Sequence, residues 1–152
     1  MVLILTLFLW MGFAAAGMAG DYTDNGDGTV TDNDTGLMWM NATMDTNNDG
    51  VTNSSDEVSW QEALAYCENA TFAGYDDWRL PNIKELRSIV DYSMYYPAIN
   101  TDYFNAKSSY YWSSTTRADD VGGAWVVDFY YGNDNYYGKS SYFYVRAVRS
   151  GQ

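Results

Sequence analysis

The chain has 152 residues, a hydrophobic content of 47% and a formal net charge of −12, so one globular domain with a packed core is expected. This negative charge repels phosphate backbones and anionic surfaces, which excludes nucleic acid as a favoured partner. The chain has no histidine and one cysteine, Cys67. These counts exclude Ser-His-Asp and Cys-His catalysis, histidine zinc sites and an internal disulfide.

The first 19 residues predict a targeting segment. Residues 2–19 form an apolar run that ends in small residues, which is typical of a cleaved signal peptide, although no Lys or Arg follows Met1 closely. The alternative is an N-terminal membrane anchor, since ~18 apolar residues just span a bilayer. We therefore expect a secreted or cell-surface protein whose only membrane contact is this segment, with one domain over residues 20–152.

The domain begins with a predicted hairpin. Residues 29–31 and 37–39 have strand composition, and they are separated by turn residues. Asp34-Thr35-Gly36 is the local sequence of an aspartic protease, but a second Asp-Thr-Gly is needed for the shared proton and none is present. The tripeptide is interpreted as a turn.

Residues 45–56 read DTNNDGVTNSSD and have the spacing of a calcium-binding loop. Oxygen ligands wrap one hard cation in such a loop, and a glycine at the sixth position, here Gly50, permits the sharp turn. We expect one structural Ca²⁺; the alternative is an Asn/Asp turn cluster without metal. The expected ligands are Asp45, Asn47, Asp49, Asn53 and Asp56, together with the backbone carbonyl of Val51.

Two helices are predicted after this loop. The first covers residues 59–69, begins at a capping box formed by Ser59 and Glu62, and turns Cys67 inward as a small buried hydrophobe. The second follows Pro81 and begins at a capping box of Asn82 and Glu85. Arg79 is interpreted as an ion-pair link between the preceding extended stretch and this helix.

Tyrosine dominates the C-terminal half, with 12 of 15 tyrosines at or after Tyr92. Strand patterns at 125–129 and 143–148 flank a Tyr, Gly, Asn, Asp and Ser stretch over 130–142, which has the composition of a paratope. A solvated hairpin loop is the alternative, and about half of the tyrosines are expected to pack in the core. The candidate ligand-binding residues are Tyr110, Tyr111, Trp112, Tyr130, Tyr131, Asn133, Asn135, Tyr136, Tyr137 and Tyr142.

Several stretches together resemble the C-terminal domain of the Legionella collagen-like adhesins over about residues 22–149. They include DNGDGTVTDNDTGLMW (24–39), GYDDWRLPNIKEL (74–86), YWSST (111–115) and VRAVR (145–149). The resemblance implies an α+β, C-type lectin-like fold with two helices packed on small antiparallel sheets joined by long loops. The C-terminal composition is also similar to that of the variable proteins of diversity-generating retroelements.

The resemblance carries one further implication and several departures. Relatives often have cysteine where this chain has Ala147, so Cys67 and Ala147 are expected to be in contact. The sugar-calcium motifs of animal C-type lectins are absent, so calcium-bridged sugar binding is not implied. Polyanion binding fits poorly with a net charge of −12.

The sequence favours an exported binding module that recognises a cell-surface protein or glycan rather than an enzyme. Tyrosine rings stack on sugars and also anchor protein interfaces, so composition alone does not choose the ligand. One alternative is a glycoside hydrolase with two facing acids among Asp119, Asp120, Asp128 and Asp134. A structural envelope protein is the other.

Overall fold

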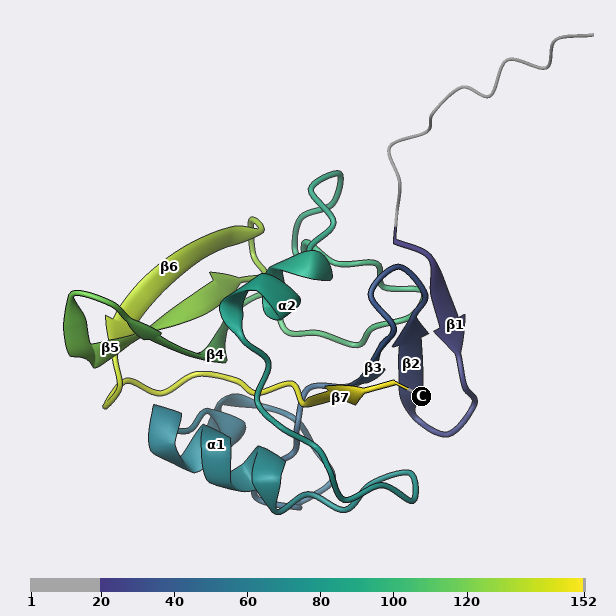
Figure 1. Cartoon of the computed structure of the whole chain (residues 1–152), viewed down its shortest axis with the longest axis horizontal. Helices are drawn as coiled ribbons and strands as arrows, with labels where there is room; N and C mark the ends of the chain where they lie inside the picture. The colour runs from purple at the N-terminus through teal and green to yellow at the C-terminus, as the bar shows by residue number, and fades with distance from the viewer. Residues whose placement is uncertain (1–19, 152) are drawn as a thin grey trace, which may run out of the picture.

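The computed structural model describes residues 20–151, so the predicted targeting segment lies outside the described residues. One antiparallel sheet contains β1 (Tyr22–Asp24), β2 (Thr29–Asp32), β3 (Leu37–Met40) and β7 (Val148–Ser150), in that spatial order. The last strand therefore pairs with the predicted N-terminal hairpin, and both ends of the described chain lie at this sheet (Figure 1).

The second sheet is an antiparallel meander of β4 (Tyr110–Arg117), β5 (Asp120–Asp128) and β6 (Asn133–Gly138). A short 3₁₀-helix, η1 (Ser54–Asp56), precedes α1 (Trp60–Glu68), and α2 (Ile83–Ser88) follows in the middle of the molecule. The segment that leads into β7 runs between α1 and the second sheet (Figure 1).

Both predicted helix starts are confirmed. Ser59 and Glu62 form a reciprocal capping box at α1, and Asn82 and Glu85 form one at α2. These boxes satisfy backbone N–H groups that have no partner within the helix. Arg79 makes two 2.8 Å hydrogen bonds to the Glu85 carboxylate, so it links the extended stretch to α2 as expected.

Two hydrophobic clusters join these layers. The first connects the two sheets through α2, with Trp39, Leu86 and Val127 fully buried. The second lies under α1, where Cys67 and Ala147 belong to the same buried group. Arg146 is also fully buried, and it donates 2.8 Å hydrogen bonds to the carbonyl oxygens of Met40 and Asn105.

Two predictions about the C-terminal region are wrong in detail. The stretch 130–142, in which no strand was predicted, contains the strand β6, because its main chain pairs with β5 along the whole of β6. The strand expected over 143–148 is regular only from Val148 onward. Residues before it form isolated bridges, Phe143 with Val58 and Tyr144 with Tyr111. This segment therefore connects the residues just before α1 to β4 of the second sheet.

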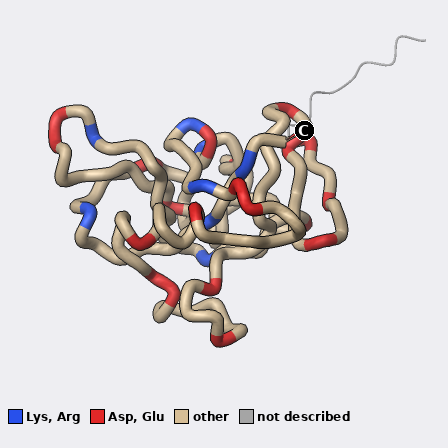
Figure 2. Tube along the Cα trace, turned by 60° about the horizontal axis from the view of Figure 1, so that its bottom comes forward, with Lys and Arg blue, Asp and Glu red and all other residues tan. Residues whose placement is uncertain are grey.

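The architecture is α+β with two helices and two small antiparallel sheets, which is compatible with a C-type lectin-like fold. Acidic positions are spread over many loops of the molecule, with fewer basic positions among them (Figure 2). Within residues 20–151, no helix combines the length and apolar character needed to cross a membrane.

Candidate functional site

The register of the second sheet divides the predicted binding residues between its two faces. Residues directly opposite each other in an antiparallel pair project to the same side, and neighbours along a strand project to opposite sides. Tyr110 pairs with Asp128, which pairs with Asn133 in β6. Trp125 pairs with Tyr136 on the other side. One side therefore carries Tyr110, Asp128, Asn133, Asn135 and Tyr137, which we call the sheet face.

The sheet face is partly open to solvent. Asn133 and Asn135 are exposed, whereas Tyr110 and Tyr137 are half-buried, with ring centroids 5.2 Å apart. Interaction with the Tyr137 hydroxyl, followed by burial, raises the pKa of Tyr110 to about 12. The Tyr110 phenol therefore stays neutral at physiological pH, and the hydroxyl groups of both residues can donate or accept hydrogen bonds.

A group of exposed rings adjoins this face where β5 ends. Ring centroids of Tyr96 and Tyr130 are 4.0 Å apart, those of Tyr130 and Tyr131 4.5 Å, and those of Tyr95 and Tyr96 5.0 Å. The exposed fractions are 68% for Tyr95, 47% for Tyr96, 37% for Tyr130 and 57% for Tyr131. Such rings offer large apolar contact area at low entropic cost. These four residues are the tyrosine cluster.

The main chain holds the tyrosine cluster in place. The Tyr96 amide donates to the Tyr130 carbonyl oxygen at 3.1 Å, and the Ala98 amide donates to Phe129 at 2.7 Å. Tyr96 has a φ of +58°, a left-handed conformation that a bulky residue rarely adopts. The Asp128 carboxylate accepts the Tyr130 amide at 2.8 Å, which fixes the turn after β5. The cluster is therefore positioned by backbone contacts, while its rings pack edge to face on one another and stay partly exposed.

Tyr95 and Tyr96 are not among the binding residues predicted from the sequence. They lie more than 30 residues from Tyr130 in the chain, and only tertiary pairing brings the two segments together. The available signal was local: two adjacent tyrosines precede Pro97, in a stretch without helix or strand periodicity. Exposed aromatic residues in such a loop favour binding over packing.

The assignment of Tyr111 and Trp112 to the exposed face is wrong, because both side chains are fully buried. The Tyr111 hydroxyl accepts the Lys107 amide at 2.8 Å and also contacts the Thr43 hydroxyl. The Trp112 indole N–H donates to the Val58 carbonyl at 2.8 Å. Each large ring finds a polar partner inside the molecule, so neither needs solvent or a ligand.

Two other predicted residues are separated from the tyrosine cluster. Tyr136 lies on the opposite side of the sheet, against Trp125, and the Arg117 guanidinium sits 3.7 Å from its ring centroid. Tyr142 is 61% exposed and lies beside Trp60 and Lys139, on the α1 side. Of the ten predicted residues, six therefore lie on the sheet face or in the tyrosine cluster, two are buried and two lie elsewhere on the surface.

Three of the four acids considered for glycoside hydrolysis, Asp119, Asp128 and Asp134, are not placed as that chemistry requires. Asp128 and Asp134 project to opposite sides of the sheet, and Asp134 pairs with Arg87 at 3.4 Å. The hydrogen bond from Arg117 lowers the pKa of Asp119, whereas a general acid needs a raised pKa. The arrangement does not favour the hydrolase alternative.

The loop over 45–56 has part of the expected calcium-loop geometry. Asp45 accepts the amides of Asp49 and Gly50 at 3.2 and 2.7 Å, and Gly50 adopts the left-handed φ of +83° that the sharp turn requires. Asn47 accepts the Asp49 amide at 2.9 Å, so these side chains turn toward the loop interior. These turns form with or without a bound cation, so calcium binding stays a prediction.

Asp56, the last expected ligand, is engaged differently. Its carboxylate is fully buried and accepts the amides of Thr46, Asn47 and Asn53 at 2.8, 3.4 and 2.8 Å. Burial raises the pKa of Asp56, but these hydrogen bonds outweigh it and hold the pKa below its usual range. Within residues 20–151, no three acidic, histidine or cysteine side chains form a metal-binding group. In this conformation the Asp56 carboxylate therefore holds the two ends of the loop together by hydrogen bonds and is not free to bind a cation.

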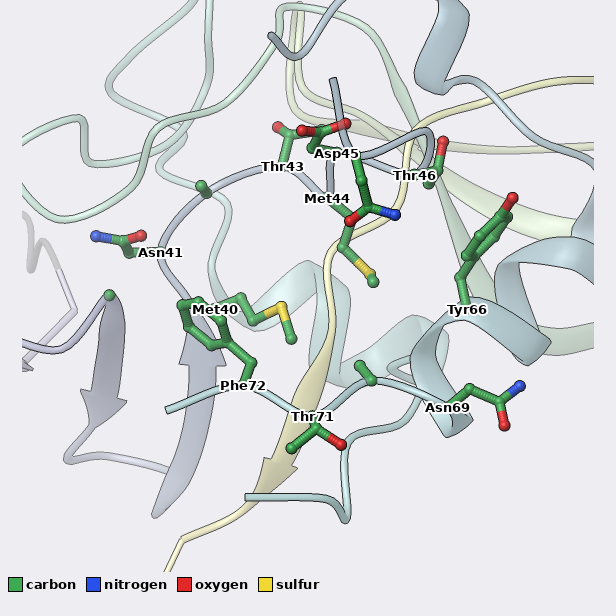
Figure 3. A pocket seen from close by; sticks show the side chains of 14 residues that line it. Met40, Asn41, Thr43, Met44, Asp45, Thr46, Tyr66, Asn69, Thr71 and Phe72 are labelled. Atoms are coloured by element: carbon green, nitrogen blue, oxygen red, sulfur yellow. The ribbon is translucent and has the colours of Figure 1, made fainter. Parts of the chain in front are cut away.

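A pocket of about 520 Å³ lies on another side of the molecule, between the 40–46 segment and the end of α1. Met40 and Met44 extend their thioethers toward it, with Phe72 and Tyr66 along its walls (Figure 3). Of the predicted site residues, only Asp45 lines it. Its lining contains no Lys or Arg, and it is separate from the tyrosine cluster.

These features define a small α+β module with an exposed aromatic surface on a lectin-like scaffold. The chain matches the family model described as the Lcl C-terminal domain over residues 28–149, and it belongs to that family. Membership of this family suggests an adhesin-type module. None of the curated proteins compared with the chain matches it.

Proposed function

We propose that the chain is an exported binding module that recognises a protein or glycan on another surface through the tyrosine cluster and the sheet face. The observation that carries the proposal is the group of four exposed tyrosines held by main-chain contacts beside Asn133 and Asn135. Aromatic anchors next to adaptable amides are the composition of binding surfaces, and folding does not require such rings to be exposed.

The experiment is a cell-surface and glycan array probed with the purified protein and with two variants. Tyr131→Ala removes an exposed ring of the tyrosine cluster, and Tyr142→Ala removes an equally exposed ring on the α1 side. Retained folding of both variants is checked by circular dichroism. We expect loss of array binding with Tyr131→Ala alone, and equal binding by both variants and the parent protein would contradict the proposal.

We also propose that the 45–56 loop takes up Ca²⁺ through Asp45, Asn47, Asp49 and Asn53, with the Val51 carbonyl as a further ligand. The support is the carboxylate and amide order of the loop and the left-handed Gly50. Asp56 would contribute only by giving up backbone hydrogen bonds, so calcium binding and loop closure compete for its carboxylate.

A further inference from the structure

We infer that the tyrosine cluster together with the Asp128 carboxylate binds a cationic side chain, so that the partner is a protein segment with exposed Lys or Arg. This inference rests on the proposed function and names the ligand chemistry of the same surface. Four observations support it: cation capping of other rings, the angles between the cluster rings, the state of Asp128, and the charge of the chain.

The chain covers several of its other aromatic rings with its own cations. The Arg117 guanidinium lies 3.7 Å from the Tyr136 ring centroid, the Lys139 ammonium 3.9 Å from that of Trp60, and the Arg149 guanidinium 3.8 Å from that of Tyr75. The negative face of an aromatic ring attracts such groups. In the described part of the chain, no Lys or Arg side chain lies over a ring of the tyrosine cluster, although its rings are among the most exposed.

The rings of the cluster stand at steep angles to one another. The interplanar angle is 76° between Tyr95 and Tyr96, 80° between Tyr96 and Tyr130, and 81° between Tyr130 and Tyr131. No pair of neighbouring rings therefore forms a flat platform on which a sugar ring could stack across both. Rings packed edge to face in this way leave exposed ring faces singly, and one exposed ring face is enough to bind a guanidinium or ammonium group.

Asp128 supplies a carboxylate next to the rings of the tyrosine cluster. Its Oδ1 accepts the Tyr130 amide, while Oδ2 has no hydrogen-bond partner in residues 20–151. Four other acids, Asp77, Glu85, Asp119 and Asp134, each form an ion pair with an arginine, whereas no ion pair of the described residues includes Asp128. The charge of Asp128 also reaches the cluster: after the larger effect of Tyr96, it contributes to the raised pKa of Tyr131.

The charge of the whole chain agrees with a basic partner. A net charge of −12 attracts cationic surfaces at long range and repels sulfated or phosphorylated polymers. Because the local carboxylate and the overall charge have the same sign, electrostatic steering and the contact site favour the same partner. A neutral glycan would gain neither from electrostatic steering nor from the charge of the Asp128 carboxylate.

The test is calorimetric titration of the purified full-length protein with hexa-arginine and with hexacitrulline, in which each charged guanidinium is replaced by a neutral urea of similar shape. Tyr131→Leu and Asp128→Asn alter the proposed site. Tyr136→Leu is the matched control, because Tyr136 is also exposed but lies on the opposite side of the sheet under Arg117. Thermal unfolding monitors the folding of each variant.

We expect hexa-arginine to bind the parent protein and Tyr136→Leu with the same affinity. It should bind Tyr131→Leu and Asp128→Asn at least tenfold more weakly. Hexacitrulline should not bind any of them. Equal hexa-arginine affinity in all variants would mean diffuse charge attraction and would overturn the inference. So would hexacitrulline binding as tight as that of hexa-arginine. Array binding that needs Tyr131 without any hexa-arginine binding would overturn the cationic partner but leave the proposed function intact. If replacing Tyr131 reduces neither array binding nor hexa-arginine binding, both the cationic partner and the proposed function are contradicted.

Discussion

Replacing Ala147 with cysteine tests the packing of α1 against the final segment. Cys67 and Ala147 are both fully buried in one cluster, and Met44 connects their surroundings. The Met44 sulfur lies 3.8 Å from the Cys67 sulfur, and its amide donates to Val145 at 2.9 Å. The Met40 amide donates to Ala147 at 3.1 Å. A disulfide between positions 67 and 147 would close a loop of about 80 residues, which the chain-entropy model values at about 4.5 kcal/mol before strain.

The assay compares urea unfolding of oxidised and reduced Ala147→Cys, so that any overpacking by the new sulfur affects both samples. Since native strain usually lowers the gain, we expect the oxidised form to be more stable by about 2–4 kcal/mol. The double variant Cys67→Ala/Ala147→Cys is the control and should show no difference between the two conditions. Two free thiols per chain after oxidation would refute the reasoning, because the Cα atoms would then lie outside the roughly 4.4–6.8 Å that a disulfide spans.

Four further predictions concern the buried and exposed rings, calcium binding by the loop, the buried Asp56 carboxylate and acid stability. Trp78→Ala should lower the free energy of unfolding by about 3–5 kcal/mol because the ring is buried, whereas Tyr131→Ala should cost about 1 kcal/mol or less; comparable losses in chemical denaturation would place the tyrosine in the core. Calcium should raise the melting temperature relative to EDTA by mass action, and Asp49→Asn should reduce this rise; identical melting curves in calcium and EDTA would contradict calcium binding. Asp56→Ala should destabilise the protein even in EDTA, because each buried amide left without an acceptor costs about 1–3 kcal/mol. Because the folded-state pKa of Asp56 is lowered, its stabilisation is present above the unfolded-state pKa and is lost as pH falls through the folded-state value; a parent protein and Asp56→Asn with the same acid-unfolding profile would argue against this role.

The parts of the fold that follow local rules could be predicted from the sequence. The capping residues of α1 and α2 and the apolar spacing behind them are short-range signals, and the structure confirms both helices. Arg79 was assigned to its ion pair for the same reason, since its partner lies only six residues away in the next helix. Local chemistry in these places agrees with the tertiary fold, as expected of a sequence that specifies one structure.

The candidate site could be predicted only in part, because strand register was not available from composition. Tyr111 and Trp112 look like Tyr110 in the sequence, yet alternation turns Tyr111 to the other side of β4. Trp112 projects to the same side as Tyr110, and partners from distant segments bury it. Tyr136 and Tyr137 are adjacent, and a single step along β6 sends them to opposite sides of the sheet. A tyrosine-rich stretch therefore identifies the region of a site, while pairing decides which rings reach it.

The pairing of β6 with β5 also bears on how readily this surface can change over generations. Its strand-to-strand bonds involve main-chain atoms, while the side chains of Asn133, Asp134, Asn135 and Tyr136 are exposed. Under the proposed function, exchanging Asn133 and Asn135, which lie on the sheet face, would alter what this surface recognises and would remove none of the main-chain bonds that hold the strand. The tyrosine cluster shares this property, because Tyr96 and Tyr130 are joined through amide and carbonyl groups. Recognition can diverge here at little cost to folding, whereas Arg146, whose guanidinium itself links Met40 and Asn105, admits no such freedom.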